Sequence, residues 1–258
     1  MRCWIAGDVH HQFLIFLRRA REWVRRGRVS RIYQLGDFGI DAAGVEELLG
    51  TPIRFPCPVF VIDGNHDDRA IWDDASTVRD LARRCQLHLC PRGTLHDGGG
   101  RPILLMGGAL HVHQRQREGV HHNALTENEV HAIIARLNIA PRLILTHSCP
   151  SILGLHPHAG GDVAHFHPDA CASPHHPGPD PHNPGEPALN ILWRWLIAQT
   201  VSQTPLWAFG HFHRPQAWHR HGIDLRCVGT VDSRDLSNDA RLLLTIPHNN
   251  DGYTQSME

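Results

Sequence analysis

The chain has 258 residues, 41% of them apolar, so it can bury a substantial core in one large domain or two small ones. Its 25 basic and 26 acidic residues give a formal net charge of −1, which excludes a global field that would favour nucleic acid or an anionic membrane. Every basic residue is arginine, which we interpret as the codon bias of a GC-rich genome rather than as phosphate recognition.

The opening of the chain has the pattern of a βαβ unit. Residues 3–8 form an apolar strand pattern, residues 12–26 place apolar side chains at helical spacing, and residues 31–37 form a second strand pattern. Gly27 suits the left-handed position that follows a helix. A parallel pair of strands joined by a helix is therefore expected at the start of the fold.

The rest of the chain alternates between strand and helix patterns. Helices are predicted over 67–84, over 126–137 from a capping box at its start, and over 188–199. Strands are predicted at 59–62, 103–106, 143–145, 206–209, 216–218, 224–228 and 241–246.

The segment 155–187 differs in composition from its surroundings. It holds seven His and eight Pro in 33 residues, and so much proline argues against a helix or an interior strand. We interpret it as a long insertion in a single domain over residues 1–250, followed by a polar tail at 251–258. Its role is open between a surface loop, a lid over the site and a further metal site.

The cysteines and the length of the apolar runs indicate in which cellular compartment the protein is expected. Seven cysteines at irregular spacing, without a CxxC pair, do not form a disulfide framework, and an odd count fits a reducing compartment. The N-terminus enters a strand pattern at once, which indicates no signal peptide, and no apolar run approaches the length of a membrane span. We expect a cytoplasmic protein without a membrane partner.

Five short segments carry metal-ligand residues where predicted strands end. They are Gly7-Asp8-Val9-His10, Gly36-Asp37, Gly64-Asn65-His66-Asp67, Thr146-His147 and Gly210-His211-Phe212-His213. Oxygen and imidazole ligands at successive strand ends can converge on one point, which suits divalent metal ions and metal-assisted hydrolysis. Residues i and i+2 of an extended segment point the same way, so Asp8 and His10 can bind one ion together.

This ordered set resembles the calcineurin-like metallophosphoesterase superfamily, whose pattern is D-x-H, GD, GNH-[DE], H and GH-x-H. The resemblance runs from Asp8 to His213. It implies an α/β fold, a four-layer αββα sandwich of two mixed sheets flanked by helices, with the site at the strand ends. Residues 91–94 and 107–109 also look like bacterial and phage single-domain members of this superfamily.

The resemblance implies a role for each motif residue. Two ligand sets are implied, which are Asp8, His10, Asp37 and His213 for the first metal and Asp37, Asn65, His147 and His211 for the second. Mn is the first choice of metal, and Fe, Zn or Co also suit these ligands. A metal-bridging hydroxide would attack phosphorus in line with the leaving group, and His66 would act as general acid.

His66 needs a carboxylate that fixes its tautomer. Asp67 is the first candidate, and Asp41 and Asp63 are the others. Ile40 stands where phosphoprotein phosphatases of this superfamily have their orienting Asp, so the chain departs from that branch.

The function predicted from the sequence is a dinuclear-metal phosphoesterase that hydrolyses a phosphomonoester or phosphodiester. A small molecule or nucleotide is the favoured substrate, because the near-neutral chain has no basic domain, and nucleic acid remains possible. The alternatives are a metal-dependent nuclease and a non-catalytic binding scaffold on the same fold. Arg115 and Arg117, in a His-rich loop, could clamp a substrate phosphate or simply be solvated. The sequence specifies no oligomeric state.

Overall fold

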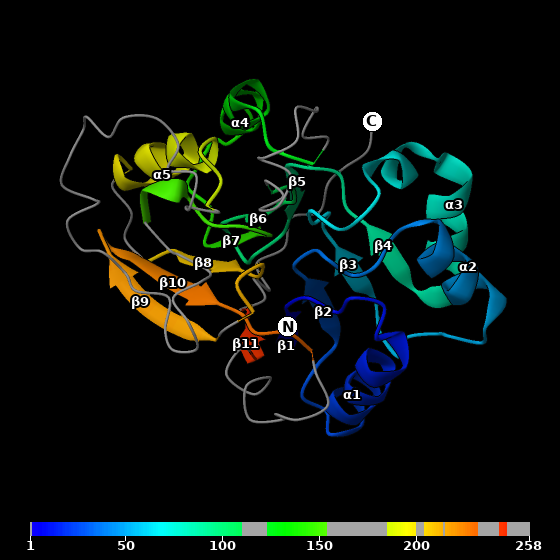
Figure 1. The fold of residues 1–258 in the computed structure, drawn as a ribbon. Helices are drawn as coiled ribbons and strands as arrows, with labels where there is room; N and C mark the ends of the chain where they lie inside the picture. The colour runs from blue at the N-terminus through cyan, green and yellow to red at the C-terminus, as the bar shows by residue number, and fades with distance from the viewer. Residues whose placement is uncertain are drawn as a thin grey trace, which may run out of the picture.

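The structure is a computed structural model that describes residues 2–109, 123–153, 185–199, 204–213, 215–231 and 243–246. Two β-sheets lie at its centre, and helices cover the outer side of each (Figure 1). This arrangement is the four-layer αββα sandwich that the sequence predicts.

The first sheet has five strands in the order β11–β1–β2–β3–β4. Their bounds are Arg2–Ala6 for β1, Arg31–Gln34 for β2, Val59–Val61 for β3, Leu87–Leu89 for β4 and Leu243–Thr245 for β11. Strands β1 to β4 are parallel, and β11 runs antiparallel to β1 at the edge. The parallel strands therefore end at the same edge of the sheet. The first two motifs, at residues 7–10 and 36–37, follow β1 and β2 at this edge.

The second sheet has six strands in the order β5–β6–β7–β8–β10–β9. Their bounds are Thr94–His96 for β5, Ile103–Met106 for β6, Leu143–Thr146 for β7, Leu206–Phe209 for β8, Gln216–Arg220 for β9 and Ile223–Cys227 for β10. Strands β6, β7, β8 and β10 are parallel, and the edge strands β5 and β9 are antiparallel to their neighbours.

The alternation of side chains along the strands builds three apolar layers. In β1, Cys3 and Ile5 face the second sheet, whereas Trp4 and Ala6 face the helices on the outer side. Strand β6 repeats this alternation between the layer shared by the sheets and the layer under its own helices. Because successive side chains point to opposite faces, these strands are buried on both sides and are apolar throughout.

Helices of both halves of the chain cover the sheets. The helical segments are α1 Phe13–Arg25, α2 Ala42–Gly50, the 3₁₀ turn η1 Arg69–Asp73, α3 Ala75–Asp80, the π turn η2 Leu81–Cys85, α4 Glu127–Ile134, the 3₁₀ turn η4 Ser151–Leu153 and α5 Leu189–Ile197. Residues of α1, α2 and η2 pack on the first sheet, and residues of α4 and α5 pack on the second. None of these described helices is long and apolar enough to cross a membrane.

The capping box predicted at Thr126 is present. The Thr126 hydroxyl accepts a hydrogen bond from the Glu129 backbone, and the Glu129 carboxylate accepts one from the Thr126 N–H. The helix predicted over 67–84 is instead broken into η1, α3 and η2, because Asp74 is extended at φ −82° and ψ 92° and caps α3 by accepting from the Ser76 N–H. Helix α2 and strands β4 and β5 were not predicted.

The two ends of the predicted insertion lie side by side. Pro150 forms a parallel bridge with Glu186, and the Glu186 N–H donates to the Cys149 carbonyl at 2.8 Å. The chain thus leaves and re-enters the fold next to β7, which precedes His147. Residues 154–184 and the predicted tail at 251–258 lie outside the described residues.

Candidate metal centre

Backbone hydrogen bonds join the motif-bearing loops to one another. The Asp37 carbonyl accepts from the N–H groups of Val9 and His10 at 3.0 and 2.9 Å, and the His147 carbonyl accepts from Gly210 at 2.9 Å. These bonds bring the ends of β1 and β2 together in one sheet and the ends of β7 and β8 together in the other. The structure thereby gathers the predicted ligands at a single edge of the sandwich.

Four of the predicted ligands adopt left-handed backbone conformations. The residues and their φ angles are His10 at 45°, Asp37 at 53°, His211 at 68° and His213 at 58°. Residues other than glycine adopt this region rarely, and it persists only where the surroundings hold it, which is common at functional sites. The left-handed turns redirect these side chains toward one another after the strands end.

Asp8, His10 and His213 form a first group of possible metal ligands. The Asp8 Oδ2 atom lies 2.9 Å from His213 Nε2 and 3.8 Å from His10 Nε2. The two imidazole Nε2 atoms are 3.2 Å apart. Each residue offers one ligand atom, and the three atoms lie within 4.8 Å of one another.

Asp37, His147 and His211 form a second group with the same spacing of ligand atoms. His147 Nε2 lies 3.4 Å from Asp37 Oδ2 and 3.0 Å from Asn65 Oδ1. The Asn65 amide oxygen therefore lies at the second group, where the sequence placed it. Each group falls within one predicted ligand set, although Asp37, which was expected in both sets, is grouped only with His147 and His211. The assignment of each residue as a ligand remains our prediction.

The donors of both groups fit a cation. The Nε2 atom of His211 is buried and has no hydrogen-bond partner within the described residues, which is costly for a polar atom unless another group satisfies it. Burial, followed by the charge of His147, lowers the pKa of His211 to about 3, so its ring is neutral. A neutral, buried imidazole beside the Asp37 carboxylate is a suitable ligand for a borderline divalent metal.

His147 is coupled to Asp37 when no cation is present. Burial opposes the charged form of His147, but the negative charge of Asp37 and its hydrogen bond with the His147 ring raise the pKa of His147 to about 10. Burial also opposes the charged form of Asp37, and His147 holds the Asp37 pKa below its usual range. Since a metal binds only neutral imidazole, binding at this group would release the His147 proton.

His66 lies beside the first group and is exposed. Its backbone N–H donates to Asp37 Oδ1 at 2.8 Å, and its ring lies edge-on to the His10 ring with centroids 5.5 Å apart. Asp37 therefore uses one oxygen toward His147 and the other toward the backbone of His66. The His66 side chain borders the open side of the site, where a substrate would approach.

The Asp67 carboxylate is engaged by backbone groups rather than by a described contact with the His66 ring. Its Oδ1 atom accepts from Gly39 and Ile40 at 2.9 and 2.8 Å. Its Oδ2 atom accepts from Asp37 and Gly64, both at 2.8 Å. Burial, followed by the charge of Asp37, raises the pKa of Asp67, and the N–H donors oppose that rise. Asp67 thus ties the Gly64–Asp67 loop to the loop that follows Asp37.

The other two carboxylates suggested as partners of His66 also have contacts elsewhere. The Asp63 carboxylate lies 2.7 Å from Arg92 Nη2 in a buried ion pair. Asp41 accepts from the Gly44 N–H at 2.8 Å, which caps α2, and lies 3.3 Å from His11 Nε2. His11 accordingly faces Asp41 and is a member of neither ligand group.

Two residues at the site were missed by sequence reasoning. The Asn123 side-chain amide donates to the carbonyls of Gly64 and Asp67 at 3.0 and 2.7 Å, with a longer contact of 3.4 Å to Asn65. Arg92 donates to the Asn123 carbonyl at 2.8 Å while it pairs with Asp63. These bonds hold the Gly64–Asp67 loop; Arg92 lies in the segment 91–94 that the resemblance included without a role, and no motif marks Asn123.

Glycine is required at two motif positions because the loops pass so close. A Cβ atom on Gly36 would lie 2.6 Å from His147 Nδ1, and Gly36 also has φ 90°. A Cβ atom on Gly64 would lie 2.2 Å from Asp37 Oδ1. The glycines of these two motifs therefore allow the ligand-bearing loops to approach one another.

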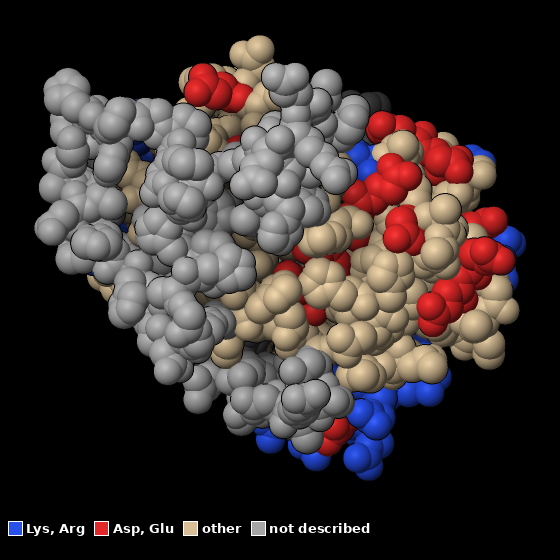
Figure 2. Space-filling model, viewed as in Figure 1, with Lys and Arg blue, Asp and Glu red and all other residues tan. Residues whose placement is uncertain are grey.

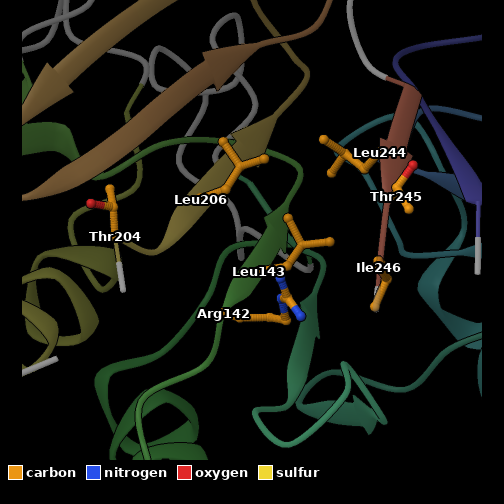
Figure 3. A pocket seen from close by; sticks show the side chains of 7 residues that line it. All are labelled: Arg142, Leu143, Thr204, Leu206, Leu244, Thr245 and Ile246. Carbon is orange, nitrogen blue, oxygen red and sulfur yellow. The ribbon is translucent and has the colours of Figure 1, made fainter. Parts of the chain in front are cut away.

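A pocket between the sheets lies away from this centre (Figure 3). Leu143 and Leu206 line it from the starts of β7 and β8, whereas the ligand residues follow the ends of these strands. Arg142, which also lines it, donates to the Gly98 carbonyl at 2.7 Å. We assign this pocket no function.

Arg115 and Arg117 lie outside the described residues.

Comparison with known proteins places the fold but not the activity. No family model matches the chain, and no curated protein matches its sequence. One solved crystal structure aligns with a TM-score of 0.56 at 12% identity, over 89% of this chain and 90% of its own. An identity this low shows the fold alone.

Two further solved structures are similar at lower scores. A phosphopantetheinyl hydrolase from Mycobacterium tuberculosis aligns with a TM-score of 0.48 at 15% identity, over 89% of each chain. An archaeal phosphodiesterase aligns with a TM-score of 0.42 at 11% identity, over 89% of this chain and 84% of its own. The similarity at a TM-score of 0.56 shows the fold, which is the two-sheet sandwich that the resemblance implied.

Proposed function

We propose that the protein is a dinuclear-metal-dependent phosphoesterase that hydrolyses a phosphomonoester or phosphodiester. The observation that carries this proposal is the pair of ligand groups, Asp8 with His10 and His213, and Asp37 with His147 and His211. Two such groups on adjoining loops suit two cations that share one substrate phosphate. Mn²⁺ is the first choice, and Fe, Zn or Co suit the same oxygen and imidazole donors.

The bound cations would supply an activated water at neutral pH and would stabilise the charge that develops on the phosphoryl oxygens. The residues of the chain supply the remaining steps. Asp37 offers an oxygen on the side of His147, and its position between the groups suits a shared ligand. Asn65 offers a neutral amide oxygen, which binds a cation without adding negative charge near the substrate.

His66 is the proposed proton donor to the leaving oxygen. Its exposed ring stands next to His10, and its backbone is held by Asp37. A protonated imidazole can give a proton to an alkoxide leaving group in the transition state, which contributes about 10²–10⁴-fold to the rate. We propose that one of the carboxylates named from the sequence orients the His66 ring, with Asp67 as the first candidate and Asp63 and Asp41 as the others.

The test is hydrolysis of p-nitrophenyl phosphate and bis-p-nitrophenyl phosphate by metal-stripped protein that is re-supplied with Mn²⁺. We expect metal-dependent turnover of at least one ester, and the ratio of the two rates gives the preference for monoesters or diesters. His131→Ala, which changes an exposed histidine on α4, serves as the matched control for His66→Ala and His147→Ala. Two bound ions per chain without turnover of either ester would favour the non-catalytic scaffold and overturn the proposal.

A further inference from the structure

Helix α1 exposes a line of arginines. Its apolar face, which includes Phe13, Phe16 and Trp23, is buried against the first sheet. On the opposite face Arg18, Arg21 and Arg25 are exposed, and Leu14 precedes them with 67% of its surface accessible. Positions i, i+4, i+7 and i+11 of a helix lie on one side, so these residues form one stripe. We call Arg18, Arg21 and Arg25 the arginine stripe.

The arginine stripe has no acidic partner within the described part of the chain. No hydrogen bond or ion pair joins its guanidinium groups to a described residue, whereas the neighbouring Arg26 pairs with Glu22 at 2.6 Å. Eight of the 25 arginines lie in residues 2–31, and the only acidic residues there are Asp8 and Glu22. Asp8 is buried in the metal centre. Among the described residues, the outer face of α1 is therefore a positive surface whose stripe arginines have no acidic partner.

The near-zero net charge conceals this surface because the acidic residues gather elsewhere. Figure 2 shows arginines at the lower edge, over α1, and acidic side chains on the neighbouring face, over α2 and α3. Exposed acidic residues of that face include Glu46, Glu47 and Asp73. A polyanion would be attracted to one side of the molecule and repelled by the next, so the charge pattern gives orientation as well as attraction.

Helix α1 links the candidate metal centre to the stripe, whose first member, Arg18, lies eight residues after His10 in the chain. Helix α1 begins at Phe13, three residues after His10, and then leads away from the ligand loops. Arg18 and Arg25 are seven residues apart, which corresponds to about 10 Å along a helix axis. In a duplex each strand carries one phosphate per about 3.4 Å of helix axis, so about 10 Å corresponds to about three nucleotide steps.

We propose that the arginine stripe docks a nucleic-acid strand and leads its backbone to the metal centre. Cleavage of the docked strand rests on the proposed phosphoesterase function, whereas docking does not. This inference narrows the substrate from phosphate esters in general to a phosphodiester in a polymer. Arginine suits the role because its planar guanidinium pairs with phosphate oxygens through two parallel hydrogen bonds.

An anionic membrane fits the same helix less well. An interfacial helix lays its apolar face into the headgroup region. In α1 that face is packed on the sheet and is not available, since Phe13 and Phe16 are 1% and 0% exposed. Leu14 alone would face a bilayer, and one leucine gives little insertion. A strand of phosphates needs only the arginines.

The experiment measures binding of the full-length chain to a fluorescein-labelled single-stranded oligonucleotide by anisotropy, at several salt concentrations and without added metal. The variant R18Q/R21Q/R25Q removes three charges at positions where Gln keeps helix propensity. The matched control R79Q/R83Q/R194Q removes three charges from exposed arginines on α3, η2 and α5. Circular dichroism and Tm of both variants verify that they are folded.

We expect the stripe variant to bind at least 10-fold more weakly and the slope of log K against log salt to fall by about 2, because each single-strand phosphate contact contributes about 0.7. The control should keep the slope of the unmodified chain. Equal slopes in all three proteins would overturn the proposal, as would a stripe variant that loses binding to phosphatidylserine vesicles while its oligonucleotide binding is unchanged. Oligonucleotide binding by the stripe without Mn²⁺-dependent turnover of either p-nitrophenyl ester would overturn the phosphoesterase function and leave docking standing.

Discussion

The Nδ1 atom of His147 lies 2.6 Å from the carbonyl oxygen of Leu35 and joins the end of β7 in one sheet to the end of β2 in the other. A carbonyl oxygen only accepts, so Nδ1 carries a proton in either charge state, and Nε2, on the side of Asp37 and Asn65, is the nitrogen that can bind a cation once its own proton is released. A backbone contact of this kind orients many metal-binding histidines. The sandwich itself therefore presents His147 Nε2 as a ligand atom.

We predict that His147→Ala binds one Mn²⁺ ion per chain instead of two. The second group then keeps only Asp37, Asn65 and His211, and turnover should fall by about 10²-fold or more because the charge clamp on phosphorus is incomplete. Metal content after dialysis is measured by mass spectrometry, with His131→Ala as the control. Retention of two ions at unchanged affinity would show that His147 is not a ligand.

For His66→Ala we predict unchanged metal content and a fall in kcat of about 10²–10⁴-fold, which is the usual contribution of a general acid. The fall should be greatest with poor leaving groups, so phenyl phosphate should be affected more than p-nitrophenyl phosphate. Loss of metal from this variant would make His66 a ligand, and an equal loss with both esters would remove its role as proton donor.

Because four backbone N–H groups donate to Asp67, we predict that substituting Asp67 lowers the free energy of unfolding more than substituting its neighbour Asp68. In Asp67→Asn the side-chain NH₂ group would face backbone N–H groups, which would lose their acceptor. We expect the free energy of unfolding to fall by about 2–4 kcal/mol. Asp68→Asn, which alters an exposed cap of η1, should cost about 1 kcal/mol or less. Urea unfolding of both variants checks the difference. A stable Asp67→Asn protein with a changed pH–rate profile would instead restore Asp67 as the partner of His66.

Asn123 should act on the metal centre through the Gly64–Asp67 loop. Asn123→Ala removes the amide that holds this loop, and we expect the Mn²⁺ concentration for half-maximal activity to rise about 10–100-fold, as for other residues that support metal ligands. Asn190→Ala is a suitable control because Asn190 also bonds a loop, through Ser151 and Ile152, and has no described hydrogen bond to the Gly64–Asp67 loop. An equal loss of stability in both variants, without a change in Mn²⁺ dependence, would reduce Asn123 to a structural residue.

The contrast between Asp8 and Asn123 shows what the sequence could predict. Asp8 lies directly after an apolar strand with His10 two residues on, so local pattern and strand topology together placed it at the site. Asn123 stands in no motif, and its bonds to Gly64 and Asp67 span 59 and 56 residues. Contacts over such sequence separations depend on how the two sheets pack together. The periodicity of apolar residues and their secondary-structure propensities do not determine that packing.

Local competition explains the differences in secondary structure. The helix predicted over 67–84 ignored the Asp74 side chain, which can cap a new helix and so ends the one before it. Helix α2 was missed because it buries only Gly44 and Leu48 and gives a weak apolar period. The fold class was predicted correctly because it depends on many strands rather than on any single boundary.

His96 on β5 predicts how stability depends on pH away from the metal centre. Its Nδ1 atom lies 3.1 Å from the Tyr33 hydroxyl. Burial, followed by the charges of Arg31 and His88, lowers the pKa of His96 to about 4. In the unfolded chain the pKa of histidine is about 6.5. Between pH 6.5 and 4 the unfolded chain therefore binds a proton that the folded chain does not.

It follows that the contribution of His96 to stability is present above pH 6.5 and is lost as the pH falls toward 4. Because the ring is partly exposed, solvent screening reduces the effect to about 1 kcal/mol, which corresponds to about 2–4 °C in Tm. The Tm of His96→Gln minus the Tm of the unmodified chain should therefore increase as the pH is lowered from 7 to 4.5. His131→Gln should show no such trend, and a constant difference between His96→Gln and the unmodified chain over this range would mean that His96 titrates alike in both states.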